Sequence, residues 1–484
     1  MRLTDFTDTT ADALRNAGAY LSGLMTPTLR LGVTGLARSG KTVFITALVR
    51  NLLAGGRLPF FSAMAEGRIE RAYLEPQPDD RLPRFAYEEH LAELAADPPR
   101  WPESTRRISQ LRVTVDYMPG SALRRVLGSG RLHVDIVDYP GEWLIDLPML
   151  GLSFAEWSAR AVADANAPRR RGTARQWMEL ATALGADAPA DEQIALRGAQ
   201  LFTHYLQEAR TPDAALAAPG PGRFLLPGDL AGSPLLTFFP MLPSGASGYA
   251  RGTLGGMLAR RYESYKAHVV KPFFRDHFAS LDRQIVLVDA LSALNAGAEA
   301  VADLEQALVA VLACFRPGAN TWASSVFAPR IDRLVFAATK ADHLHHSSHD
   351  RLEALLRSIV GQAIERASFA GADVKVLALA ALRATHEAEA RSGRQRLPCI
   401  VGVPMPGERI AGKVYDGRKE AAVFPGDLPD DPAALSTLPV QEAVHFVRFS
   451  PPRISLDTPS VEGPALPHIR LDRALEFLLG DQLA

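Results

Sequence analysis

Residues 29–53 read LRLGVTGLARSGKTVFITALVRNLL, an apolar run, a glycine-rich turn and a second apolar run in succession. The first seven residues form an apolar run that breaks at Gly35, as a buried strand does, and VFITALVRNLL is apolar around most of a helical circumference. Between them, Gly35 to Thr42 match the pattern G-x-x-x-x-G-K-[ST]. Because a strand before and a helix after are the context that this pattern requires, the sequence predicts a loop that binds the phosphates of a nucleotide.

Each part of this phosphate loop has a chemical reason. Glycines let the backbone wrap close to phosphates, and successive amides together with the helix N-terminus form a cradle for anions. Lys41 places a compact charge on the β and γ oxygens, and the hydroxyl of Thr42 can bind Mg²⁺. The nucleotide contacts predicted in this loop are Gly35, Arg38, Ser39, Gly40, Lys41, Thr42 and Val43.

A second motif, Asp138-Tyr-Pro-Gly141, lies at the end of the strand-like run LHVDIVD. A carboxylate at a strand tip can hold Mg²⁺ through water, and Gly141 can bring its amide to a γ-phosphate with no side chain in the way. Asp, Pro and Gly are also ordinary turn residues. The position at a strand end, after the phosphate loop, favours the metal role for Asp138 over the competing Asp135, which lies within the strand.

A third motif, Thr339-Lys340-Ala341-Asp342, follows the apolar run LVFAA. A carboxylate here can accept two N–H donors from the edge of a guanine ring, while the lysine stem lies along the base plane. Adenine offers no such donor pair, so the motif would select guanine over adenine. The alternative interpretation is an ordinary charged turn after the strand. The chain has only 7 Lys against 46 Arg, so arginine is its usual basic residue. Lysine at positions 340 and 41 therefore indicates that these sites require lysine specifically.

Two weaker signals complete the predicted nucleotide site. Thr105, with Ser104 as the alternative, precedes the strand-like run that begins at Ile108, where a switch threonine that closes on Mg²⁺ would lie. The backbone amides of Ala380, Ala381 and Leu382 can reach the base oxygen.

Four histidines follow the third motif, namely His343, His345, His346 and His349. His345 and His349 have the i, i+4 spacing of helical metal ligands. No carboxylate-rich partner set is evident in the sequence, which favours a solvated loop over a metal site.

The remaining segments predict the fold class. IVLVDAL (285–291), RLVFAATK (333–340) and VKVLALAAL (374–382) are apolar strands separated by helices, typical of an α/β protein with a mostly parallel sheet covered on both faces. Runs at 108–115 and 132–137 predict an antiparallel pair, and residues 55–104 a long, partly irregular loop. We expect a P-loop domain of residues 1–143 plus 283–484, interrupted by a mainly helical insertion, 144–282.

Composition excludes several classes of protein. With 53 basic and 54 acidic residues the net charge is −1, so general nucleic-acid binding is not expected. Two cysteines are too few for a disulfide framework, the longest apolar run is too short to span a bilayer, and the N-terminus lacks a signal-peptide layout. These features favour the cytoplasm.

In this order, the segments LGVTGLARSGKTVFITALVRNLL, DYPGEWL, IVLVDALSALNAG, AATKADHL and LALAALRAT resemble the YcjX-like family, bacterial stress-associated P-loop proteins often described as predicted ATPases. The resemblance implies a Ras-like G domain with a helical insertion. It makes Thr105 the first switch threonine, Asp138 to Gly141 the second-switch motif and Thr339 to Asp342 the base-reading motif. Thr339 replaces the usual Asn, and Ala380-Ala381-Leu382 departs from the usual Ser-Ala-Lys.

Catalysis is where the sequence departs most from Ras-like proteins. The residue after Gly141 is typically a glutamine that orients water, whereas here it is Glu142, whose carboxylate a γ-phosphate would repel unless it is protonated or paired. With Lys41, Gly141 and Glu142 as catalytic candidates, we expect slow GTP hydrolysis with Mg²⁺, accelerated by an arginine from the insertion or from an unidentified protein partner. The alternatives are an ATPase or small-molecule kinase, and a nucleotide-stabilised scaffold without turnover.

Overall fold

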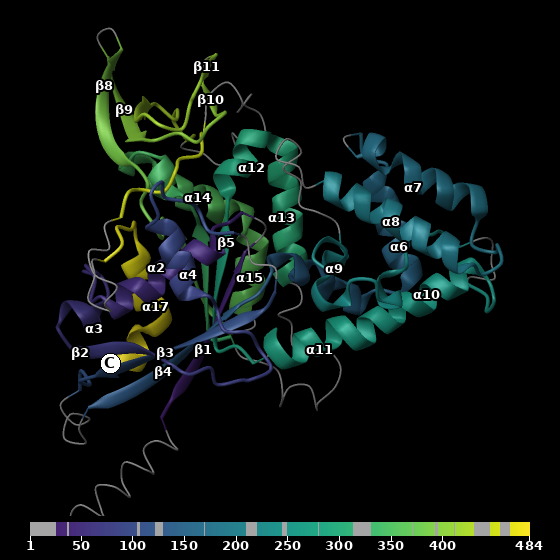
Figure 1. Cartoon of the computed structure of the whole chain (residues 1–484), viewed down its shortest axis with the longest axis horizontal. Helices are drawn as coiled ribbons and strands as arrows, with labels where there is room; N and C mark the ends of the chain where they lie inside the picture. The colour runs from purple at the N-terminus through teal and green to yellow at the C-terminus, as the bar shows by residue number, and fades with distance from the viewer. Residues whose placement is uncertain are drawn as a thin grey trace, which may run out of the picture.

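The structure is a computed structural model of the chain (Figure 1). It describes residues 26–35, 38–103, 107–121, 129–168, 170–209, 220–243, 249–278, 280–312, 331–369, 371–392, 395–410, 412–429, 446–454 and 465–484.

The centre of the fold is a seven-stranded sheet. Its spatial order is β2 (Ile69–Glu75), β3 (Ser109–Tyr117), β4 (Gly130–Asp138), β1 (Thr28–Gly35), β5 (Arg283–Val288), β6 (Arg333–Ala338) and β7 (Asp373–Ala378). The strands from β4 to β7 are parallel, and β3 is antiparallel to both of its neighbours. The predicted antiparallel pair and the α/β fold class of a P-loop NTPase are therefore confirmed.

The sheet separates two hydrophobic clusters, which explains why its inner strands are almost continuously apolar. In β5, Ile285 and Leu287 belong to one cluster, and Val286 and Val288 to the other. The first cluster includes side chains of α2 (Lys41–Leu53), α3 (Ser62–Ala65), α4 (Tyr87–Leu94) and α17 (Leu471–Leu479). The second includes side chains of α12 (Ala290–Ala296), α13 (Ala298–Leu312), α14 (His349–Ile359) and α15 (Gly361–Phe369).

The prediction of an irregular loop over 55–104 is wrong in part. Residues Ile69–Glu75 form the edge strand β2, antiparallel to β3, with an irregularity between Ile69 and Arg71. Only Ala72 of this strand is buried. An edge strand buries little and tolerates charge, so β2 lacks the apolar pattern that marked the inner strands.

Every described element between β4 and β5 is helical, and these elements lie to one side of the sheet (Figure 1). They are η1 (Gly141–Gly151), α6 (Phe154–Ala165), α7 (Arg171–Leu184), α8 (Glu192–Glu208), α9 (Gly222–Leu225), η2 (Gly228–Leu230), η3 (Pro234–Leu236), α10 (Leu254–Tyr265), η4 (Lys266–Val270), α11 (Lys271–Phe273) and η5 (Phe274–Phe278). Their buried side chains are continuous with the second cluster, so they share a core with one face of the sheet. We call them the inserted helices.

The segment after β7 adds a small second sheet of β8 (His386–Ser392), β9 (Gln395–Gly402) and β12 (Ala421–Val423), and the pair β10 (Arg409–Ile410) and β11 (Lys413–Val414). Short helices η7 (Ala341–His343) and η8 (His346–Ser348) follow β6, and η10 (Gly480–Leu483) follows α17. None of the helices in the described ranges has the length and apolar character needed to cross a bilayer.

Candidate functional site

The carboxyl ends of the parallel strands meet at one edge of the sheet, and all three sequence motifs begin there. β4 ends at Asp138, and β1 ends at Gly35, the first residue of the phosphate loop. The neighbouring strands β5 and β6 end just before Asp289 and Thr339. In open parallel sheets, ligands bind outside these ends. The topology therefore brings the motifs together as one candidate site.

The phosphate loop has a backbone shape suited to close contact with an anion. Gly40, directly before α2, has a φ of 84°, and Arg38 has a φ of 64°. Both values lie in the left-handed region, which lets a short loop turn its amides inward. A Cβ at Gly35 would lie 2.4 Å from the carbonyl oxygen of Leu287, so no larger residue fits. Residues 36–37 lie outside the described ranges.

The start of α2 concentrates positive charge beside this loop. None of the described side chains caps the helix, and its first turn contains no acidic residue, so its amides retain their partial positive charge. Lys41 is only 7% exposed, and its ammonium donates to the carbonyl of Gly35 at 3.1 Å. The lysine is thus folded back onto the loop that precedes it.

Thr42 contacts the segment in which a switch threonine was predicted. Its hydroxyl donates to the carbonyl of Glu103 at 3.2 Å, across 61 residues of sequence. Thr105 and its alternative Ser104 lie outside the described residues, so their role stays a prediction. The contact of Thr42 nevertheless brings the residue before them to the start of α2.

Asp135 and Asp138 differ in their surroundings, although both are buried. Arg112, opposite Asp135 on β3, donates two hydrogen bonds of 2.6 and 2.8 Å to its carboxylate. Asp135 is therefore engaged in an ion pair within the sheet. Asp138 is the last residue of β4, level with Val33 of β1. This arrangement favours Asp138 as the candidate ligand.

The residues after Asp138 pack directly against the inserted helices. Gly141 begins η1, and the side chain of Glu142 is buried. A Cβ at Gly222, the first residue of α9, would lie 1.8 Å from the carbonyl oxygen of Glu142. The two backbones are therefore in contact at this point.

Asp146 stabilises the contact between η1 and α9 by two hydrogen bonds. Its Oδ1 accepts the amide of Gly222 and its Oδ2 accepts the hydroxyl of Tyr265, both at 2.6 Å. Burial raises the pKa of Asp146 to about 6, although both hydrogen bonds lower it. Asp146 was not predicted from the sequence, because its partners lie 76 and 119 residues away.

An arginine of the inserted helices also lies beside this segment. The guanidinium carbon of Arg223 is 3.2 Å from the centre of the Trp143 ring, a cation–π contact. Burial lowers the pKa of Arg223. This arginine thus lies against the residue two positions after Gly141.

The base-reading motif is held by β5. The amide and hydroxyl of Thr339 donate to the carbonyl of Val288 at 2.9 and 3.3 Å. Lys340 has a φ of 61°, and its ammonium pairs with Asp289. Burial raises the pKa of Asp289, but Lys340 and Ser292 outweigh this effect and hold it below its ordinary value. Asp289 was not predicted; its position after a buried strand was the available signal.

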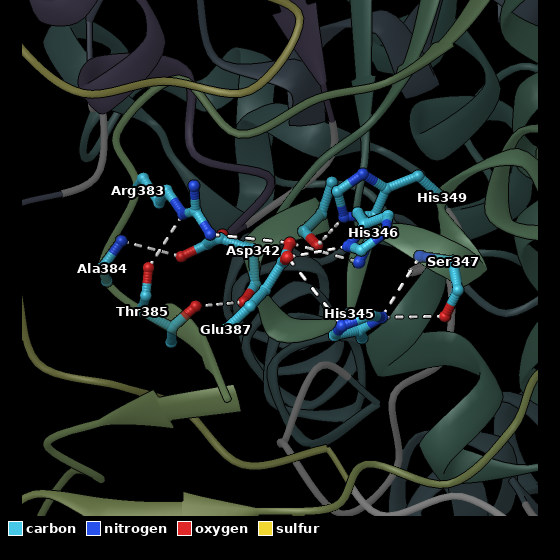
Figure 2. Close-up of polar contacts among 10 residues, drawn as sticks. Asp342, His345, His346, Ser347, His349, Arg383, Ala384, Thr385 and Glu387 are labelled. Carbon is cyan, nitrogen blue, oxygen red and sulfur yellow. Dashed lines mark hydrogen bonds and ion pairs between the residues drawn. The ribbon is translucent and has the colours of Figure 1, made fainter. Parts of the chain in front are cut away.

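Asp342 is oriented by the residues that precede β8 (Figure 2). Its Oδ2 accepts the amide of Ala384 at 2.9 Å, and its backbone carbonyl accepts the hydroxyl of Thr385. Because the side chain is only 4% exposed, these bonds fix the direction of its carboxylate.

The three amides predicted to reach the base oxygen do not share one role. The amide of Ala380 donates to the carbonyl of Ile469 at 3.1 Å, so it is not available to a base. Within the described part of the chain, the amides of Ala381 and Leu382 make no hydrogen bond. Only these two stay candidates for that contact.

Comparison with known proteins gives a consistent result. The family model described as YcjX-like family, DUF463, matches residues 29–483. A relative named Ras-like GTPase YcjX, from Escherichia coli (strain K12), is 40% identical over 470 residues, covering 94% of this chain and 96% of its own. A relative of the same name from Shewanella oneidensis is 35% identical over 483 residues, covering 94% of each chain.

Proposed function

The chain belongs to the YcjX-like family, and from that premise we propose that it is a Mg²⁺-dependent guanine-nucleotide-binding protein that hydrolyses GTP slowly and changes conformation with its nucleotide state. The observation that carries the proposal is the buried ammonium of Lys41, which lies on the carbonyl of Gly35 beside the uncapped start of α2. The β and γ oxygens of a nucleotide would replace that carbonyl as its acceptor.

The residues present fit a magnesium ion. Mg²⁺ prefers oxygen ligands and keeps several waters. The hydroxyl of Thr42 would bind it directly and the carboxylate of Asp138 through water, with Thr105 as the predicted third group. The ion would neutralise charge on the phosphates. Thr42 would exchange its present acceptor, the carbonyl of Glu103, for the metal.

Guanine specificity is proposed from Asp342. A carboxylate has about four acceptor positions, and the amide of Ala384 occupies one of them. The others would accept the two N–H donors on the guanine edge. The stem of Lys340, held by Asp289, would lie along the base plane, and the amides of Ala381 and Leu382 would reach the base oxygen.

Slow hydrolysis is proposed from Glu142. A carboxylate next to a γ-phosphate is repelled by it and is a poor substitute for a glutamine that orients water. Gly141 would donate its amide to the γ-phosphate, and Lys41 would balance the charge on the phosphates. Arg223, against Trp143, is the candidate for the accelerating arginine from the insertion.

The test is a pair of calorimetric titrations with GDP and with ADP, in the presence of Mg²⁺. We expect GDP to bind at least about a hundredfold more tightly, and Asp342→Asn to shift the preference toward xanthosine diphosphate, because an amide donates where the carboxylate accepted. Asp373→Asn, at the opposite end of the sheet, is the control and should bind GDP normally. Tight ADP binding with weak GDP binding would rule out the guanine assignment.

A further inference from the structure

Three side chains close to the base-reading motif point toward one another (Figure 2). His345 and His346 precede α14, and Glu387 lies on β8, 41 residues after His346. One potential ligand atom from each lies within 4.8 Å of the other two. Nδ1 of His346 is 2.7 Å and Nε2 of His345 is 3.9 Å from Oε2 of Glu387.

These distances suit a small tetrahedral ion. With metal–ligand bonds of about 2.0–2.2 Å, the ligand atoms around Zn²⁺ lie about 3.3 Å apart, so each of the two distances to Glu387 would change by about 0.6 Å. The two ring nitrogens, now within 4.8 Å of each other, would move to the same separation. Two imidazoles and one carboxylate, with a fourth position open to water, are a known donor set of zinc. We propose that His345, His346 and Glu387 bind a divalent transition metal of the zinc type.

Neighbouring groups hold two of the ligands in place. Nδ1 of His345 accepts the amide of Ser347 at 3.4 Å and lies 2.9 Å from its Oγ. Metal binding at Nε2 would place the ring proton on Nδ1, where Oγ of Ser347 would accept it in place of the amide contact. Oε1 of Glu387 accepts the amide of His346 at 3.2 Å and lies 3.5 Å from Nη2 of Arg383. These partners occupy Oε1, so the other oxygen faces the two rings. Such outer contacts fix ligand orientation in metal sites.

The site is distinct from the proposed magnesium site. Imidazole suits zinc, copper and nickel, whereas Mg²⁺ selects oxygen ligands. The other two histidines of the cluster have different roles. The ring of His343 packs edge-on against that of Phe449, with 5.3 Å between the ring centres. Nε2 of His349 donates to the carbonyl of Ala341 at 2.9 Å. Both are buried, so the interpretation of a solvated loop is wrong for them.

A bound metal would connect the same two segments that orient Asp342. His345 lies three residues after Asp342, and Glu387 lies two residues after Thr385, which already donates to the carbonyl of Asp342. By joining the segment that contains His345 and His346 to β8, the metal would hold the carboxylate of Asp342 in its present direction. This coupling, unlike the metal site, rests on the proposed function. We expect metal to raise GDP affinity by about fivefold or more.

The site is tested by calorimetric titration of Zn²⁺ into the untagged, chelator-stripped chain without nucleotide. We expect one Zn²⁺ per chain and at least about tenfold weaker binding in His346→Ala, whose 67% exposed side chain can be removed without unfolding. Glu387→Gln preserves shape and should weaken binding similarly. His204→Ala is the matched control, because His204 and Glu208 form an exposed 3.1 Å pair on α8 that lacks a third ligand among the described residues.

Absence of saturable binding, or equal affinity in the wild type, His346→Ala and Glu387→Gln, would overturn the metal site. Equal GDP affinity with and without Zn²⁺ would overturn the coupling. Failure of GDP to bind at all contradicts the proposed function, and it is distinguishable because the zinc titration contains no nucleotide.

Discussion

The hydroxyl of Tyr265 donates a 2.6 Å hydrogen bond to Oδ2 of Asp146, and both side chains are buried. Tyr265 ends α10, while Asp146 lies on η1, the helix that begins at Gly141. The bond therefore connects the inserted helices to the residues that follow the Asp138-Tyr-Pro-Gly141 motif. A movement of that motif with nucleotide state would be transmitted to α10 through this contact.

Removing this hydroxyl should destabilise the protein. In Tyr265→Phe the carboxylate of Asp146 loses one donor inside the core, and we expect the free energy of unfolding to fall by about 1–3 kcal/mol. Urea denaturation at neutral pH measures this change. Tyr73→Phe is the control, because the Tyr73 hydroxyl on β2 makes no hydrogen bond to the described residues. Equal stability of the two variants would show that the buried bond contributes nothing.

Asp146 should make stability depend on pH. Its folded pKa of about 6 lies above the value of about 3.9 for an unfolded aspartate, so the folded state binds the proton more tightly. Stability therefore falls as pH rises from about 4 to about 6, by about 3 kcal/mol in total. Asp146→Asn keeps an acceptor for Gly222 and cannot ionise, so its thermal unfolding temperature should lack this fall. The same pH profile in both proteins would contradict the assignment.

The backbone contact at Gly222 should tolerate no side chain. In Gly222→Ala the new Cβ would lie 1.8 Å from the carbonyl oxygen of Glu142, so α9 or η1 must shift. We expect a loss of at least about 2 kcal/mol of unfolding free energy. Gly172→Ala on α7 is the control, because a Cβ there meets no atom within 4 Å. Since alanine favours the helix, this variant should raise the unfolding free energy by at most about 1 kcal/mol.

Glu142 should limit GTP hydrolysis. If charge repulsion is the cause, Glu142→Gln raises the single-turnover rate by about tenfold or more, equivalent to about 1.4 kcal/mol of barrier. Glu142→Ala separates two explanations, because it removes the charge without supplying an amide to orient water. An unchanged rate in both variants, with GTP still bound, would show that Glu142 is not the limiting group.

Sequence alone predicted the parts of the site that are contiguous in the chain. The phosphate loop needs only a strand, two glycines and a helix in succession, so Gly35 to Thr42 could be read directly. The roles of Asp289 and Glu387 could not, because they depend on partners distant in sequence: Lys340 is 51 residues from Asp289, and His346 is 41 residues from Glu387. The arrangement of elements in space decides such pairs, and one sequence does not reveal it.

In the fold, too, the elements with a clear local sequence pattern were predicted and those without one were missed. The inner strands were predicted because burial on both faces requires apolar residues at nearly every position, as in β5. The edge strand β2 was missed because its one buried side chain, Ala72, gives no alternation. The boundaries 144 and 282 of the insertion stay a prediction, since the core of the inserted helices is continuous with that of the sheet.

The position of α17 has a consequence for biosynthesis. Its leucines cover the same face of the sheet as α2, and its Asp472 accepts the amide of Phe60 at 3.1 Å, across 412 residues. A ribosome adds about 5–20 residues per second, so this span takes roughly 20 to 80 s to translate. Throughout that interval the part of this cluster contributed by β1 and α2 lacks the leucines of α17. We therefore expect the nascent chain to expose apolar surface that chaperones can bind.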